Sequence, residues 1–188
     1  MKSGVIILIA VGLALVLGGC EFVGSRNKLA SEKEAIAGQW SQVDADLERR
    51  ADLIPNLVET VKGYAKEETT VVQSVANARA ALVGAKSPQE KIDANNQLTG
   101  ALGRLLVVVE NYPNLKANEN FKQLQFELAG TENRILQSRR RYNEAVQQYN
   151  TDLSLFPGNI VASVSGFRRE DAYFKPEPGA RTAPKVQF

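Results

Sequence analysis

Apolar residues recur every three or four positions along most of the chain, the spacing that places side chains on one face of an α-helix. Ile36, Trp40 and Val43 follow this spacing and predict a first helix over residues 22–50. A stricter seven-residue repeat follows over residues 52–84, and such a repeat is typical of helices that pack side by side. No stretch of useful length alternates with a period of two. The pattern therefore predicts an all-α protein.

The boundary between these first two helices depends on two residues. Asp52 is a residue type that caps helix N-termini, and Pro55 suits a first helical turn, where a missing amide hydrogen costs little. We therefore expect the chain to bend at residues 50–52, with Asp52 as an N-cap. The alternative is that Pro55 only kinks one long helix.

The later helix boundaries are marked by capping residues. Ser87, Pro88 and Glu90 form the signature of a capping box and predict the start of a third helix. Asn118 is expected to cap a fourth helix, which the Phe-Pro-Gly sequence at residues 156–158 ends. Four amphipathic helices, three of them closed by short connections, predict an antiparallel up-and-down four-helix bundle with long helices.

The first 20 residues form a separate segment. Residues 4–19 are apolar without interruption, just short of the length that usually spans a membrane. The sequence Leu-Gly-Gly-Cys at residues 17–20 resembles a bacterial lipobox, in which Cys20 is lipidated after a signal peptide is removed. The alternative is an uncleaved transmembrane helix with an incidental Cys. Either anchor attaches the protein to a membrane.

The side of the membrane depends on which anchor is used. Arg26, Lys28 and Lys33 follow the apolar segment and Lys2 alone precedes it, so an uncleaved helix would leave the bulk of the protein in the cytoplasm. A lipoprotein would be extracytoplasmic (periplasmic), and the single Cys stands where the lipid would attach, which slightly favours that side. The expected parts of the chain are an anchor, a helical bundle, and a short apolar segment with an extended tail, over residues 1–20, 21–156 and 157–188.

The composition narrows the classes of function. The chain has 23 basic and 21 acidic residues and a net charge of +2, which argues against a nucleic-acid-binding protein. It has no His, so a Ser-His-acid catalytic set is excluded and a di-iron centre with Glu-x-x-His pairs is not expected. One Cys permits neither an intrachain disulfide nor a zinc cluster. We therefore expect no metal and no cofactor.

Charged residues stand at or beside core-facing positions of the predicted helices. Glu68 and Arg79 belong to the second helix, and Glu132 and Arg139 to the fourth. On facing helices these side chains could form a buried network of ion pairs, which commonly fixes helix register at some cost in stability. The catalytic alternative is a general acid–base pair of carboxylates, which would need a cleft.

A second polar cluster lies where the first two helices are expected to meet. It comprises Arg49, Arg50, Asp52 and Asn56. As an exposed corner, these residues could engage a partner or an anionic headgroup through guanidinium groups and free helix amides. The alternative is structural, with Asp52 and Asn56 satisfying turn amides and the Arg side chains solvated or paired locally.

Two long segments resemble the signature of the LemA family. The first half of the signature matches Trp40-Ser41, RRADLIPNLVETVKGYA at 49–65, Glu68 and Arg79. The second half matches residues 112–135, 139–146, Tyr149-Asn150, Phe156-Pro157, Gly166-Phe167 and the ending PKVQF. The resemblance implies a bacterial protein with an N-terminal membrane anchor and a four-helix bundle. It implies no particular reaction, substrate or cofactor, and family members carry either a lipobox-like anchor or a plain transmembrane helix.

Three hypotheses for the function follow. The first is a non-enzymatic scaffold or interaction module of the cell envelope, acting through a protein partner or self-association. The second is a ligand-binding or sensing protein whose polar site is the corner from Arg50 to Asn56. The third and weakest is a hydrolase, because the sequence offers neither a His nor a free catalytic Cys. The residues point to no nucleic-acid partner and to no particular small-molecule substrate.

Overall fold

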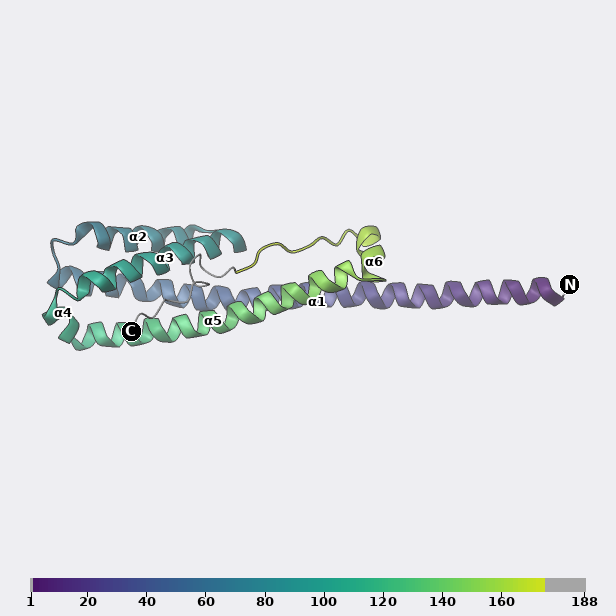
Figure 1. The fold of residues 1–188 in the computed structure, drawn as a ribbon, viewed down its shortest axis with the longest axis horizontal. Helices are drawn as coiled ribbons and strands as arrows, with labels where there is room; N and C mark the ends of the chain where they lie inside the picture. Colours follow the sequence, from purple (N-terminus) through teal and green to yellow (C-terminus); the bar gives the residue numbers. More distant parts are fainter. Residues whose placement is uncertain (1, 175–188) are drawn as a thin grey trace, which may run out of the picture. The chain divides into compact units, whose positions relative to one another are not determined.

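The computed structural model describes residues 2–174, and the regular structure of this part of the chain is entirely helical (Figure 1). The helices are α1 (Lys2–Tyr64), α2 (Thr69–Gly84), α3 (Pro88–Val109), α4 (Pro113–Ala117), α5 (Glu119–Ser154) and α6 (Gly158–Ser165). The all-α prediction is confirmed. The predicted tail over residues 175–188 lies outside the described residues.

The predicted break near Asp52 is wrong, because α1 continues through it to Tyr64 with Pro55 inside the helix. Asp52 is exposed within the helix and is not an N-cap. The chain turns instead at residues 65–68, so the seven-residue repeat of the sequence is divided between α1 and α2. Glu68 consequently lies in the turn before α2 rather than at a core position of a helix.

The two later helix starts are confirmed. Ser87 Oγ accepts a hydrogen bond from the amide of Glu90 at 3.2 Å, and Glu90 Oε2 accepts one from the amide of Ser87 at 3.1 Å, which completes the capping box of α3. Asn118 Oδ1 accepts a hydrogen bond from the amide of Phe121 at 3.0 Å and caps α5. Two short helices, α4 and α6, were not expected from the sequence.

The described chain divides into two compact units, each considered by itself. The bundle unit comprises residues 41–140 and 172–174, and the anchor unit comprises residues 2–40 and 141–171. In the bundle unit, α2 and α3 lie beside the last part of α1 and the first part of α5 (Figure 1). The core of this unit includes Val43, Leu47, Ile54, Leu57, Leu98, Leu105, Phe121 and Ile135. The up-and-down connectivity of a four-helix bundle stays a prediction.

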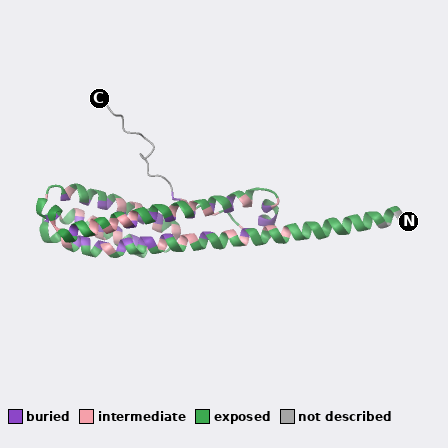
Figure 2. Cartoon of the chain, turned by 90° about the horizontal axis from the view of Figure 1, so that it is seen from below, coloured by how far each residue is buried: buried purple, intermediate pink, exposed green. Residues whose placement is uncertain are grey.

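The anchor unit combines an exposed apolar helix end with a small packed region. The apolar beginning of α1 is exposed along its length (Figure 2). Farther along α1, Trp40 meets Tyr142 of α5 edge to face, with ring centroids 5.3 Å apart. Tyr149 and Asn150 then hold the segment after α6. The Tyr149 hydroxyl donates to the carbonyl of Arg168 at 2.8 Å, and the Asn150 amide donates to that of Glu170 at 2.7 Å.

Candidate functional site

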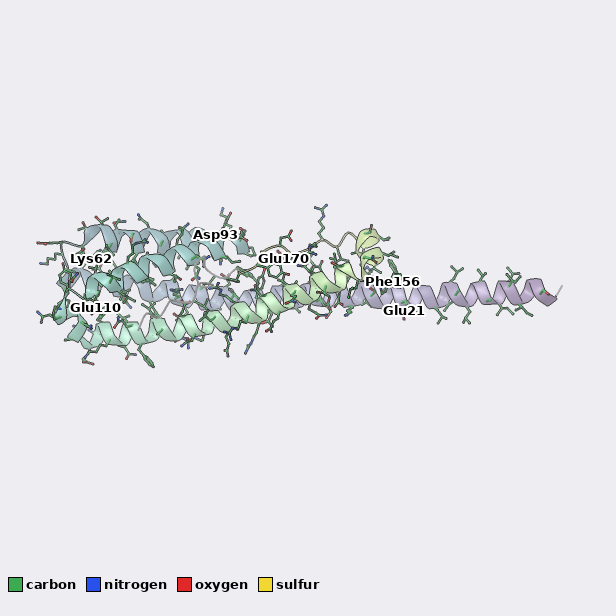
Figure 3. All side chains as sticks on the ribbon, in the orientation of Figure 1. Glu21, Lys62, Asp93, Glu110, Phe156 and Glu170 are labelled. Carbon is green, nitrogen blue, oxygen red and sulfur yellow. The ribbon has the colours of Figure 1, made fainter. Side chains whose placement is uncertain are left out.

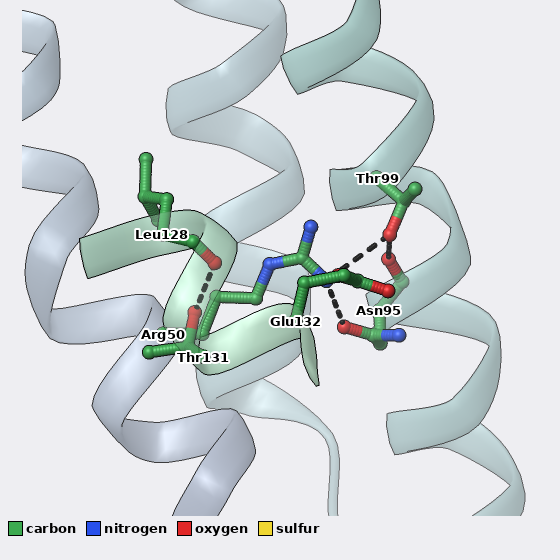
Figure 4. A network of polar contacts seen from close by, with 6 residues as sticks. All are labelled: Arg50, Asn95, Thr99, Leu128, Thr131 and Glu132. Atoms are coloured by element: carbon green, nitrogen blue, oxygen red, sulfur yellow. Dashed lines mark hydrogen bonds and ion pairs between the residues drawn. The ribbon is translucent and has the colours of Figure 1, made fainter. Parts of the chain in front are cut away.

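A buried guanidinium links three helices of the bundle unit (Figure 4). Arg50 of α1 donates through Nη1 to Asn95 Oδ1 at 2.9 Å and to Thr99 Oγ1 at 3.1 Å, both on α3. The same nitrogen lies 2.7 Å from Glu132 Oε2 of α5. We call Arg50, Asn95, Thr99 and Glu132 the Arg50 network. It joins α1, α3 and α5 through charge-assisted contacts, which are stronger than hydrogen bonds between neutral groups.

The Arg50 network is buried on one side and reaches solvent on the other. The Arg50 residue is 4% exposed, whereas the Glu132 side chain retains 32% of its exposure. Burial lowers the pKa of Arg50, the carboxylate of Glu132 opposes that change, and the nearby charge of Arg139 adds to it. A guanidinium remains charged despite such a change, because its ordinary pKa lies far above neutrality. Arg50 therefore depends on Glu132 for charge compensation.

The structure divides the predicted corner. Arg50 is buried in the bundle unit, so its interpretation as part of an exposed corner is wrong. Arg49, Asp52 and Asn56 are exposed on α1. Arg50 continues the core spacing of Val43, Leu47, Ile54 and Leu57 once α1 is a single helix, and the expected break at residues 50–52 hid this signal. Its partners Asn95 and Glu132 lie far from it in the sequence.

Arg79 has a role that the sequence did not predict. Because Pro55 has no amide hydrogen, the carbonyl of Ala51 loses the helical hydrogen bond that residue 55 would otherwise donate. Arg79 Nε of α2 donates to this carbonyl at 2.9 Å. A side chain from a second helix thus replaces the missing backbone donor, and it lets α1 continue through Pro55.

Exchanging Arg79 for Met is expected to lower the free energy of unfolding by about 1–3 kcal/mol, since the carbonyl of Ala51 loses its donor. Pro55→Ala restores a backbone donor to that carbonyl, so the same Arg79→Met exchange should cost less in the Pro55→Ala protein. Urea denaturation of the four proteins measures the coupling. Additive effects, within about 0.5 kcal/mol, would contradict this role.

The other residues of the predicted ion-pair network have separate partners. Glu68 accepts a hydrogen bond from the Tyr112 hydroxyl at 3.0 Å. The guanidinium of Arg139 lies over the Phe174 ring, 4.5 Å from its centroid, in a cation–π contact. With Glu132 on Arg50 and Arg79 on a carbonyl, the expected single cluster of four is divided among four places in the bundle unit.

Sequence reasoning also missed a buried polar pair. Asp46, an acidic residue one position before the buried Leu47, is itself buried and accepts a hydrogen bond from Ser138 of α5. The two residues are 92 positions apart in the sequence. Neither the residue types nor their spacing marks this pair, because a Ser within a helix does not indicate whether its side chain faces the core or the solvent.

A polar cavity opens on the same unit. It has a volume of about 280 Å³ and is lined by residues of α1, α2 and α3, among them Asp44, Asp52, Arg79 and Lys91. Lys91 and Asp44 form an ion pair at its wall. Asp52 is the one member of the predicted corner that lines this cavity. Among the described residues, no group of three or more His, Cys, Asp or Glu side chains could hold a metal ion.

The anchor unit contains a second charged cluster. Lys28 Nζ of α1 lies 2.9 Å from Asp152 Oδ2 near the end of α5, and the carboxyl groups of Glu32 and Asp152 share a hydrogen bond. Burial, followed by this hydrogen bond, raises the pKa of Glu32 to about 7. The hydrogen bonds from Glu32 and Lys28 lower the pKa of Asp152 to about 2. Between these two pKa values, a protonated Glu32 therefore donates to an ionised Asp152.

This cluster predicts a dependence of stability on pH. Because the pKa of Glu32 rises on folding from about 4.5 to about 7, its contribution to stability is complete below about pH 4.5 and is lost as the pH rises through 7. Between about pH 5 and about pH 8, the free energy of unfolding should fall by about 1–2 kcal/mol more in the wild type than in Glu32→Gln, which keeps a donor at all pH values. Thermal denaturation across this range measures the difference, and parallel curves would contradict it.

Comparison with known protein families gives one match that includes the whole bundle unit. A model of the LemA family matches residues 39–188. This chain belongs to the LemA family. The match begins one residue before Trp40, so the resemblance drawn from the sequence motifs is confirmed. Among the residues of this LemA-family chain that carry the resemblance, Arg50 and Glu132 hold helices together, and Arg79 supports the helix at Pro55.

Several curated relatives align with parts of the LemA-family chain. It is 35% identical over 91 residues to Magnetosome protein MamQ 2 of Paramagnetospirillum magneticum and 31% identical over 91 residues to Magnetosome protein MamQ of Magnetospirillum gryphiswaldense. Each alignment covers 48% of this chain and 33% of the relative. Protein LemA of Metamycoplasma hominis is 26% identical over 145 residues, which are 75% of this chain and 65% of that protein. The chain thus spans about a third of the length of the magnetosome relatives that it matches.

Proposed function

We propose that this protein is a membrane-anchored, non-enzymatic scaffold whose four-helix bundle docks a protein partner. The observation that carries the proposal is that the candidate polar side chains already bind other residues of the bundle unit. Arg50, Glu132 and Arg79 are engaged in joining helices, so the residues that suggested chemistry have structural partners inside the bundle unit. Buried polar groups of this kind commonly specify how helices align. We therefore place partner binding at the surface of the bundle unit.

The anchor is supported by the beginning of α1. This helix contains an apolar segment long enough to cross a membrane, and the segment is not buried within the described structure. Because α1 is one helix from Lys2 to Tyr64, it joins this segment to the bundle without a loop. Cys20 is exposed and available for a lipid. Metabolic labelling with a palmitate analogue should mark the wild type and not Cys20→Ala if the anchor is a lipid, and neither protein if it is a transmembrane helix.

The docking surface is supported by exposed apolar side chains on the bundle unit. Phe126 of α5 is 76% exposed, and Val107 of α3 is 72% exposed. An exposed aromatic side chain leaves apolar area in contact with water, and aromatic residues including Phe are enriched where protein interfaces form. We therefore assign Phe126 as a central docking position.

Photo-crosslinking in cells tests the docking function. The full chain carries a photoreactive phenylalanine analogue at position 126, and the matched control carries it at position 59, because the Glu59 side chain is also 73% exposed. We expect one discrete protein adduct from position 126 and a much weaker one from position 59. Equal, diffuse labelling from both positions would contradict the assignment.

A second candidate function, a small-molecule binding site, is favoured by the cavity that Asp52, Arg79 and Lys91 line. A lining with both acidic and basic side chains would suit a small zwitterion, and a site there would use Asp52 rather than the buried Arg50. A panel of amino acids should then raise the melting temperature of the wild type, and the increase should be lost in Asp52→Asn. No increase with any of them in the wild type would contradict this candidate.

A further inference from the structure

An apolar stripe on α6 and the turn before it is left uncovered in the anchor unit. Ile160 and Val164 are four positions apart, which places them on one face of α6, and Phe156 lies in the turn before this helix. Phe156 is 79% exposed and Val164 is 71% exposed, and Ile160 is exposed by more than half. The opposite face is packed, with Val161 and Ala162 buried. The helix therefore has two apolar faces, and only one of them is covered by protein.

The position of this stripe along α1 is fixed by several contacts. Phe156, Pro157 and Gly158 line a cavity of about 310 Å³ together with Glu21, Gly24 and Ser25 of α1. Figure 3 shows the labelled Phe156 close to Glu21 beside α6. The ion pair between Lys28 and Asp152 joins the end of α5 to the same part of α1. The first turn of α6 thus lies beside residues 21–28 of α1.

That position coincides with the expected edge of a bilayer. The uncharged residues from Gly4 to Cys20 extend about 25 Å as a helix, which approaches the roughly 30 Å thickness of the hydrocarbon core. Glu21 is the first charged residue after this apolar segment begins, and Arg26 and Lys28 follow. A helix that exposes an apolar face binds at the boundary between headgroups and acyl chains.

We propose that the Phe156-Ile160-Val164 stripe of α6 inserts into the membrane interface beside the segment of α1 that spans the bilayer. The partner is the lipid surface itself, since the stripe lies next to the apolar segment of α1, which is similarly exposed. Arg168 and Arg169 follow α6, are exposed, and provide cationic groups at headgroup level. The inference rests on the transmembrane form of the proposed anchor and adds a second, interfacial contact that fixes the orientation of the anchor unit on the bilayer.

Fluorescence quenching in vesicles tests the interfacial contact. Full-length protein with Trp40→Phe is reconstituted into phosphatidylcholine–phosphatidylglycerol vesicles with bromines near the headgroups, and a single Trp is introduced by Ile160→Trp. Its emission should be largely lost relative to unbrominated vesicles. The matched control, Glu144→Trp at an exposed position of α5 in the same unit, should keep its emission.

A third variant separates this inference from the anchor. Leu13→Trp should be quenched by lipids brominated deep in the acyl chains if α1 spans the bilayer. Quenching of Leu13→Trp without quenching of Ile160→Trp would overturn the interfacial contact and leave the anchor intact. Quenching of neither would overturn both. Protection of Ile160→Trp that increases with the protein-to-lipid ratio would show that a second copy, and not lipid, covers the stripe, which also overturns the inference.

Discussion

Arg50→Met is expected to lower the free energy of unfolding by about 2–4 kcal/mol, because Glu132 keeps its charge and loses the guanidinium that compensates it. Asn95 and Thr99 also lose a donor that reaches them from α1. This loss of stability should exceed that of an ordinary surface substitution. In urea denaturation it should appear as a lower midpoint, while the dependence of the free energy of unfolding on urea concentration stays the same.

The neighbouring residue provides the control for this effect. Arg49→Met removes the same side chain from an exposed position one residue earlier and should change the free energy of unfolding by less than about 0.5 kcal/mol. In the double variant Arg50→Met, Glu132→Leu, most of the stability should return, since no charge is left without its partner. Equal effects of Arg49→Met and Arg50→Met would contradict the burial of Arg50.

Gly158→Ala is expected to disrupt the junction of α5 and α6. A Cβ atom at residue 158 would lie 2.0 Å from the carbonyl oxygen of Asp152, so the backbone itself would have to move. We expect a loss of about 2–3 kcal/mol, which is typical of an overpacked site. Hydrogen exchange should show faster exchange of the α6 amides, together with a lower melting temperature of the full chain.

Gly63→Ala is the matched control for this steric effect. A Cβ atom at residue 63 would meet nothing within 4 Å, and the residue lies near the end of α1. Alanine there should leave stability unchanged or raise it by up to about 1 kcal/mol. A Gly158→Ala protein as stable as Gly63→Ala, with unchanged exchange of α6, would contradict the close approach.

The sequence predicted those features of the fold that depend on near neighbours. The caps at Ser87 and Asn118 use residues within three positions of each other, and both are present in the structure. The length and composition of the apolar N-terminus likewise predicted an apolar segment distinct from the packed helices. Family membership followed from ordered motifs that extend over most of the chain.

The features that the sequence did not predict depend on distant residues. Asp52 and Pro55 favoured a helix break over one long helix, since the donor that compensates for Pro55, Arg79, lies on another helix. The polar partners of Arg50 and Asp46 lie on other helices, Asn95 and Glu132 for Arg50 and Ser138 for Asp46. A short apolar run such as α6 has too few turns for its period to separate a helix from an irregular segment.

The central claim is that the Arg50 network sets the architecture of the bundle and that a partner binds at its surface. The most direct test compares the photo-crosslinked adduct from position 126 in the wild type, in Arg50→Met and in Arg50→Met, Glu132→Leu, with circular dichroism of each purified protein. We predict that the adduct weakens in the single variant as the fold is destabilised and returns in the double variant. A double variant that is folded and stable but forms no adduct would contradict the claim, because the buried pair would then be needed for more than the fold.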